Sequence, residues 1–215
     1  MATASTERSS PARTRLALVH AAERLVARHG ISGFSTQLLH AEAGVRNVSA
    51  LQYHFGSRAD LIRSVWSYRM ATINPRRLQL LAAASRDDLY GVAEAIIRPL
   101  AEQLEPRPEG NHYLRFLERL EREPQAEYHG PYRETEGLLL ALTALRRCLA
   151  GRFPHSVDMR LRFAGTQITS SLARIEADIE RGELSLSSLS AMLGMLKQSV
   201  VAALLAPEPE PVAAG

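Results

Sequence analysis

The chain is poor in the residue types that mark secreted, disulfide-linked or membrane-bound proteins. Its only cysteine is Cys148, so no disulfide can form within the chain and a reducing compartment is expected. This thiol lies in an apolar helical segment, which favours a buried structural role over redox sensing. Residues 1–11 lack the apolar core of a signal peptide. No apolar run approaches the ~18 residues of a membrane span, so we expect a cytoplasmic protein without a membrane partner.

Strand-like sequence is also missing. No stretch alternates apolar and polar residues in the manner of a β-strand, and aromatic residues make up only 6% of the chain. Alanine and leucine, which favour helices, are abundant instead. The sequence therefore predicts an all-α protein of about nine helices. The net charge of +3 permits nucleic-acid binding without demonstrating it.

Catalytic and metal-binding motifs are not found either. The sequence contains no Gly-x-Ser-x-Gly, Walker loop, Gly-x-Gly-x-x-Gly, His-Glu-x-x-His or paired Cys-x-x-Cys. The seven histidines are scattered, and no two are four residues apart. We therefore expect no enzyme, no metal and no cofactor, with a helical enzyme as a remote alternative.

The stretch from Phe34 to Leu61 is the most informative part of the chain. It fits two short helices joined by a turn at Gly44, with a third helix starting at Ser57. This is the layout of a helix-turn-helix, whose second helix can enter the major groove of DNA. A regulator that binds double-stranded DNA is therefore the leading hypothesis.

Capping residues support this layout. Ser35 can cap the first short helix, in which Leu38, Leu39 and Ala43 form the apolar side. Asn47 is the expected cap of the second helix, which would run from about Val48 to Phe55. In that helix the spacing of Val48, Leu51 and Phe55 predicts that they face inward. Ser57 and Asp60 have capping-box spacing and open the next helix.

These residues carry a family resemblance. The segment from Arg15 to Leu61 resembles the N-terminal domain of the TetR family of bacterial transcriptional regulators. The similarity is densest at Ala43-Gly44-Val45, at Leu51-Gln52-Tyr53-His54-Phe55 and at Gly56-Ser57-Arg58-x-x-Leu61. One departure is that the spacing between Val45 and Leu51 is one residue longer than the commonest family spacing. The resemblance implies a three-helix DNA-binding domain followed by a larger helical domain, and it favours repression over activation.

The remaining helices give the expected domain organisation. An arm at residues 1–12 precedes the DNA-binding domain at 13–56, the effector-binding and dimerisation domain at 57–206, and a tail at 207–215. Outside the helix-turn-helix, helices are expected at 12–29, 57–74, 86–105, 111–123, 132–153, 156–181 and 187–205. Prolines 75 and 99 are expected to kink or interrupt two of these helices, and residues 124–131 are expected to form a loop.

Candidate DNA contacts follow from side-chain chemistry. Gln bonds adenine edges and Arg bonds guanine edges, whereas hydroxyl groups and cations suit phosphates. The base-reading candidates are Arg46, Asn47, Ser49 and Gln52. The phosphate-binding candidates are Thr36, Tyr53, His54 and Arg58. Each also has a structural alternative, such as capping for Thr36 or packing for His54.

The last two helices suggest a homodimer. Small residues recur every four positions at Gly165, Thr169, Ala173 and Ala177, which permits close helix approach. The final helix adds an apolar stripe of Leu189, Leu193, Leu196 and Val200. All of these could instead belong to the core of one chain. The resemblance favours a dimer, because the last two helices of the family pair across a two-fold axis.

The middle helices suggest an effector site. Bulky and polar side chains stand among alanine and leucine there, a mixture that suits a mostly apolar pocket with a few polar anchors. The candidates are Trp66, Met70, Arg98, Tyr113, Phe116, Phe163 and Gln167. The leading function is therefore a homodimeric repressor that a small apolar effector releases from a palindromic operator. The alternative is a helical DNA-binding regulator gated by a protein partner, or not gated at all.

Overall fold

The computed structural model describes residues 10–85, 87–123 and 136–208. Within these ranges the chain forms nine α-helices and no β-strand, which confirms the predicted all-α class. The helices are α1 Pro11–His29, α2 Thr36–Glu42, α3 Ala50–Phe55, α4 Arg58–Ala83, α5 Leu89–Ala101, α6 Tyr113–Glu121, α7 Glu136–Ala150, α8 Val157–Glu180 and α9 Leu189–Leu205.

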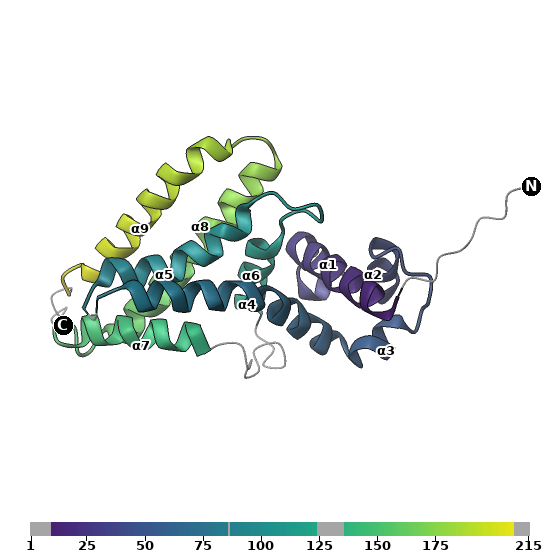
Figure 1. Cartoon of the computed structure of the whole chain (residues 1–215), viewed down its shortest axis with the longest axis horizontal. Helices are drawn as coiled ribbons and strands as arrows, with labels where there is room; N and C mark the ends of the chain where they lie inside the picture. Colours follow the sequence, from purple (N-terminus) through teal and green to yellow (C-terminus); the bar gives the residue numbers. More distant parts are fainter. Residues whose placement is uncertain (1–9, 86, 124–135, 209–215) are drawn as a thin grey trace, which may run out of the picture.

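The helices form a smaller and a larger group that share α4. Figure 1 shows α1, α2 and α3 at one end of an elongated molecule, with α5 to α9 toward the other end. Helix α4 starts beside α3 and continues into the larger group, where it packs against α5 and α7. Helix α4 is therefore a continuous connection between the larger group and the helix-turn-helix.

The apolar face of α1 holds the smaller group together. Leu18, Ala22, Leu25 and Val26, the stripe expected from the sequence, are all 0–2% exposed. Helix α4 covers this face with Leu61, which is fully buried, and α6 of the larger group packs against α1 as well. The smaller group thus has its own core but also contacts the larger group directly.

Side-chain caps and one glycine set the ends of the short helices, as predicted. The Ser35 hydroxyl accepts the Leu38 N–H at 3.1 Å, and the Ser57 hydroxyl accepts the Asp60 N–H at 3.0 Å. Gly44 has φ +64°, a left-handed conformation that strains any residue with a Cβ atom. These residues fix the turn that orients α3 relative to α2.

The start of α3 differs from the sequence prediction. The helix begins at Ala50, and the Asn47 side-chain oxygen accepts the Ser49 N–H at 3.0 Å, so Asn47 caps a turn ahead of the helix. The prediction that Val48 faces inward is wrong because Val48 precedes the helix and is 81% exposed. Leu38 is also exposed, whereas Leu39 is buried.

Several predicted element ends are also corrected. Helix α4 continues through Pro75 to Ala83, because its packing against α5 and α7 offsets the one hydrogen bond that proline removes. Pro99 likewise lies inside α5. Helix α1 begins at Pro11, within the expected arm. The rest of that arm (1–9), the loop at 124–131, the predicted helical residues 132–135 and tail residues 209–215 lie outside the described ranges.

Two of the four small residues of α8 predicted in a dimer interface, Thr169 and Ala173, pack inside the chain, so they are not available to a second copy. Thr169 and Ala173 are 3% and 2% exposed, and the Thr169 hydroxyl donates to the Glu121 carboxylate of α6 at 3.1 Å. The close helix approach that small residues permit is thus made with α6 of the same chain. Gly165 is exposed and lines a cavity, Leu196 and Val200 are buried, and Ala177, Leu189 and Leu193 are half-buried.

Helix α9 is apolar on nearly every side. The stretch Leu186–Leu205 is, among the described residues, long and apolar enough to cross a membrane, which corrects the sequence reading, yet only 22% of its most apolar window is buried in the chain. Lys197 is the one charged residue of α9 and pairs with Glu94 of α5 at 2.8 Å. A helix that is apolar on all sides is normally buried on all sides. The exposed outer face of α9 is therefore suited to packing against another apolar surface.

Candidate functional site

The outward face of the helix-turn-helix presents polar side chains. Ala50 anchors α3 in the core at 2% exposed, and Leu51 and Phe55 pack against the core beside it. Gln52 and Tyr53 therefore point away from the core, and Tyr53 is 77% exposed. Rigid attachment on one side and exposure on the other are what a recognition helix requires.

The turn before α3 extends this surface. Arg46, Asn47 and Ser49 are all exposed, as is Thr36 at the start of α2. Val48 lies among them and was missed from the sequence, because its expected helical register placed it in the core. An exposed valine on a DNA-facing surface can contact a thymine methyl group. His54 is half-buried, with its ring edge-on to Tyr53 at 4.9 Å between centroids.

Arg58, a predicted phosphate contact, has partners within the chain. Its guanidinium donates to the backbone carbonyls of Ile31 and Phe34 and lies 4.3 Å from the centroid of the Phe34 ring. These contacts tie the start of α4 to the segment between α1 and α2. Arg58 therefore helps to hold the smaller group of helices together.

A cavity of about 360 Å³ lies inside the larger group of helices. This volume is within the range of about 300–1,000 Å³ that small-molecule sites occupy. Trp66 and Met70 of α4 line it, as the sequence predicted. Most other lining residues are apolar and come from α5 to α9, namely Ala93, Ile96, Leu100, Leu117, Leu138, Leu142, Leu145, Leu161, Ala164, Ile168, Val200 and Leu204.

The other predicted effector residues do not line this cavity. Tyr113 and Phe116 are buried in the core, where their rings stack at 6.0 Å between centroids. Phe163 is 64% exposed on α8. Arg98 pairs with Glu94 at the surface, and Gln167 donates to the Ser199 hydroxyl at 2.7 Å. Periodicity could not distinguish core, surface and cavity, because each kind of position accepts a bulky side chain.

The polar residues of the cavity were not nominated from the sequence. They include Arg77, Glu121, Arg162, Thr166 and Thr169. Arg77 is the most buried of the charged residues at 2% exposed, whereas Glu121 and Arg162 are exposed. In the sequence these three charged residues look like the many other charged residues of the chain. No sequence pattern distinguishes a buried arginine from an exposed one.

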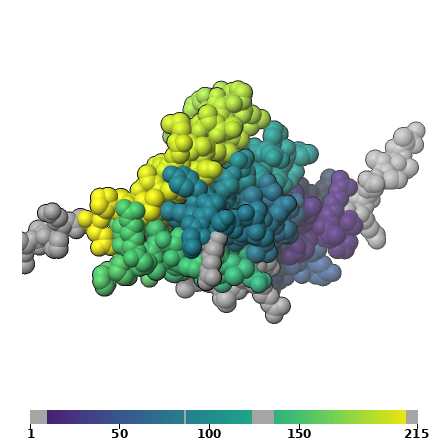
Figure 2. All heavy atoms as spheres, turned by 60° about the vertical axis from the view of Figure 1, so that its left-hand side comes forward, coloured from purple at the N-terminus to yellow at the C-terminus, as the bar shows by residue number. Residues whose placement is uncertain are grey.

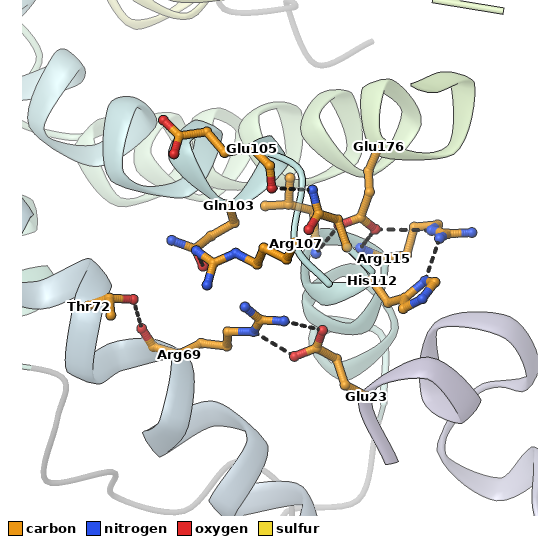
Figure 3. Close-up of polar contacts among 11 residues, drawn as sticks. Glu23, Arg69, Thr72, Gln103, Glu105, Arg107, His112, Arg115 and Glu176 are labelled. Atoms are coloured by element: carbon orange, nitrogen blue, oxygen red, sulfur yellow. Dashed lines mark hydrogen bonds and ion pairs between the residues drawn. The ribbon is translucent and has the colours of Figure 1, made fainter. Parts of the chain in front are cut away.

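A buried ion pair joins the two groups of helices. Glu23 of α1 accepts two hydrogen bonds from Arg69 of α4, at 2.6 and 2.7 Å, and both side chains are 2% exposed. Figure 3 shows the two side chains pointing toward one another between the helices. Burial lowers the pKa of Arg69, but the hydrogen bonds that Arg69 donates to Glu23, together with the charge of that carboxylate, outweigh it and the net shift is upward. This bidentate pair fixes α1 against the middle of α4.

A second polar cluster fixes α6. The Glu176 carboxylate of α8 accepts the backbone N–H groups of Leu114 and Arg115 at 3.0 and 3.1 Å, which satisfies the first turn of α6 (Figure 3). Arg115 also donates to the Glu176 carboxylate at 3.0 Å and to Nδ1 of His112 at 2.9 Å. Helix α6 both lines the cavity and packs on α1, so this cluster fixes a helix that contacts both groups.

The acid stability of the protein should depend on His112. Burial and the neighbouring Arg115 lower the pKa of His112 from 6.5 to about 4. Protons therefore bind the unfolded chain more readily, so stability present above pH 6.5 is lost as the pH falls toward 4. This shift corresponds to about 3 kcal/mol. We expect His112→Asn, which retains an acceptor for Arg115, to lose less stability over this window in urea unfolding.

Comparing the unmodified protein with His112→Asn removes the contribution of Glu176 to the pH dependence of stability. Burial raises the pKa of that carboxyl despite its hydrogen bonds, so its effect on stability runs in the opposite sense. Because Glu176 is present in both proteins, it does not alter the difference between their slopes. If the free energy of unfolding changes equally with pH in both proteins between pH 6.5 and 4, His112 does not contribute to the acid dependence of stability.

Cys148 behaves as a structural thiol. It is half-buried in α7, and burial raises the pKa of its thiol. The reactive thiolate is therefore disfavoured, as the sequence reading expected.

Comparisons with known proteins bear on the N-terminal domain and on the fold. Residues 18–65 match the family model described as bacterial regulatory proteins, tetR family. Bacillus subtilis FadR, a transcriptional regulator solved with stearoyl-CoA, is similar in structure, with a TM-score of 0.56 and 14% identity over 87% of this chain and 98% of FadR. Pseudomonas aeruginosa NalD, the secondary repressor of the MexAB-OprM multidrug efflux pump, is also similar in structure. Its TM-score is 0.53, with 17% identity over 90% of this chain and 98% of NalD. No curated protein sequence matches significantly.

Proposed function

Because the chain belongs by its N-terminal domain to the TetR family of bacterial regulatory proteins, we propose that it is a cytoplasmic homodimeric repressor. It binds a palindromic operator through two helix-turn-helix units, and a small effector in the cavity releases it. The observation that carries this proposal is the exposed face of Gln52 and Tyr53 on a helix whose opposite face is anchored by Ala50. The base-reading and phosphate-binding candidates surround this face.

Selection of bound fragments from random DNA tests this proposal. Two reading units related by a two-fold axis should select half-sites centred about one helical turn, or roughly 34–36 Å, apart. Affinity should fall steeply with salt, because phosphate contacts release counterions. A selected motif without a dyad, or a complex insensitive to salt, would contradict the proposal.

Neighbouring residues of α3 should have different effects on binding. Gln52→Ala removes hydrogen bonds to a base edge and should cost about 1–3 kcal/mol at one base pair of each half-site, relaxing specificity there. Tyr53→Phe removes a hydroxyl that we assign to a phosphate, so it should weaken all sequences about equally. Affinities of both variants for the operator and its single-base changes measure the difference. The reverse pattern would show that the assigned orientation of α3 is wrong.

The cavity is placed to control the helix-turn-helix. Trp66 and Met70 belong to α4, whose first turn packs beside α3, and Leu117 belongs to α6, which packs on α1. An effector that binds the two conformations unequally would shift α4 and α6 and change the separation of the reading units. A tenfold loss of operator affinity requires a coupling of only about 1.4 kcal/mol.

A screen of small molecules distinguishes this gating from the alternative of a protein partner. Trp66 is the only tryptophan and lines the cavity, so its fluorescence reports binding directly. We expect at least one ligand that changes this signal and weakens operator binding. If ligands fill the cavity without altering operator affinity, gating by a protein partner becomes the better hypothesis.

The surface for the second copy lies on the outer faces of α8 and α9. Phe163 and Met195 are 64% and 68% exposed there, and Ser170 and Ala202 lie on the same outer faces. Figure 2 shows α9, in yellow, as a ridge along the edge of the molecule. A second copy would cover this face and bury the apolar side of α9 that the chain leaves exposed. Thr169 and Ala173 of the predicted interface are buried within the chain, so the exposed residues of α8 and α9 take their place in this assignment.

A further inference from the structure

The structure contains two buried arginines on α4 with different surroundings. Arg69 forms the bidentate pair with Glu23, and its pKa is raised. Arg77, two turns further along the helix, donates to the Asn74 side-chain oxygen at 2.9 Å and has no carboxylate within ion-pair distance among the described residues. Its Nε is buried without an acceptor, and burial lowers the pKa of its guanidinium. A buried cation without an anion is costly.

Arg77 lies in the wall of the cavity, with Trp66 and Met70 on the same helix. The other charged lining residues are Arg162 and Glu121, so the three charges sum to one positive charge. Glu121 is exposed and accepts from Thr169, which leaves its charge screened by water. Arg77 therefore dominates the electrostatic character of the interior, and the rest of the wall is largely apolar.

We propose that the cavity binds an amphipathic anion, an apolar molecule with one acidic head group that pairs with Arg77. The apolar part would lie against Trp66, Met70 and the leucines of α7, and the head group would supply the acceptor that Arg77 Nε lacks. A carboxylate fits a guanidinium through two parallel hydrogen bonds. This inference rests on the proposed effector role of the cavity and specifies the chemical class of the effector.

Matched acid and alcohol probes test the role of the charge. Decanoate with 1-decanol and 4-phenylbutanoate with 4-phenylbutanol are titrated against the full chain, with Trp66 fluorescence as the signal. We expect at least one acid to bind tenfold or more tightly than its alcohol. Arg77→Met should remove that preference by weakening the acid and leaving the alcohol unchanged. Arg162→Met, at the exposed rim, is the matched control and should change acid binding less than threefold.

Stability provides a readout that does not depend on the choice of probe. Replacing an unpaired buried charge with an apolar side chain of similar length should raise the melting temperature of the unliganded protein. A lower melting temperature for Arg77→Met would show that Arg77 is a structural residue and overturn the proposal. It is overturned equally if no acid binds more tightly than its alcohol, or if Arg77→Met retains the preference.

Operator binding, measured in parallel, separates this proposal from gating itself. If acids bind through Arg77 but operator affinity is unchanged, the anion site stands and effector gating fails. If only neutral molecules release the operator, gating stands and the anion site fails. If acids bind through Arg77 and release the operator, both are supported.

Discussion

Glu23→Ala should lower the free energy of unfolding by about 3–5 kcal/mol, because it leaves the Arg69 guanidinium buried without its anion. The pair is 2% exposed on both sides and bidentate, so water cannot replace the lost carboxylate. Urea unfolding followed by Trp66 fluorescence measures the loss. The double variant Glu23→Leu/Arg69→Met removes both charges and should recover most of it, since an apolar pair of similar volume is often as stable as a buried ion pair.

A surface ion pair provides the matched control. Glu118 and Arg122 form an i, i+4 pair on α6 in which Arg122 is 62% exposed. Arg122→Ala should change the free energy of unfolding by less than about 0.5 kcal/mol. A Glu23→Ala variant as stable as this control would mean that the buried pair does not fix α1 on α4. The route from the cavity through α4 to the reading unit would then depend on apolar packing alone.

Local signals in the sequence predicted the local structure. Ser35, Gly44 and Ser57 act on backbone groups within a few residues of themselves, so their roles could be inferred without knowledge of the fold. The apolar stripe of α1 was equally visible, because helical spacing alone identifies the face that must be buried. The start of α3 was misplaced because Asn47 can cap either a helix or a turn. Only the tertiary contacts of Ala50 decide between them.

Longer-range features could not be obtained in this way. Spacing identifies the small-residue face of α8 but not the helix that packs on it, and α6 of the same chain is the one that does. Glu23 and Arg69 are separated by 46 residues, so their pairing depends on how α1 and α4 cross. Arg77 is one arginine among many in the sequence. Its importance comes from burial without a carboxylate partner in the described structure.

The outer face of α8 and α9 is the place where one substitution should change operator binding most. Met195 is 68% exposed on a helix whose single charge, Lys197, is already paired with Glu94 of the same chain. Met195→Arg would place a second positive charge against its symmetry mate in the proposed dimer, where it would have no partner. We expect monomers by light scattering. Because a monomer binds one half-site only, operator affinity should fall by about 100-fold or more.

Leu139→Arg is the control for surface charge. Leu139 is 59% exposed on α7, which lies on the other side of α5 from α9 (Figure 1). This variant adds the same charge to a similarly exposed apolar residue and should remain dimeric with nearly unchanged operator affinity. If Met195→Arg stays dimeric and Leu139→Arg does not, the second copy docks on α7. If the unmodified protein is a monomer at micromolar concentration, the exposed face of α9 has another partner. The prediction of an operator with two-fold symmetry would then also be wrong.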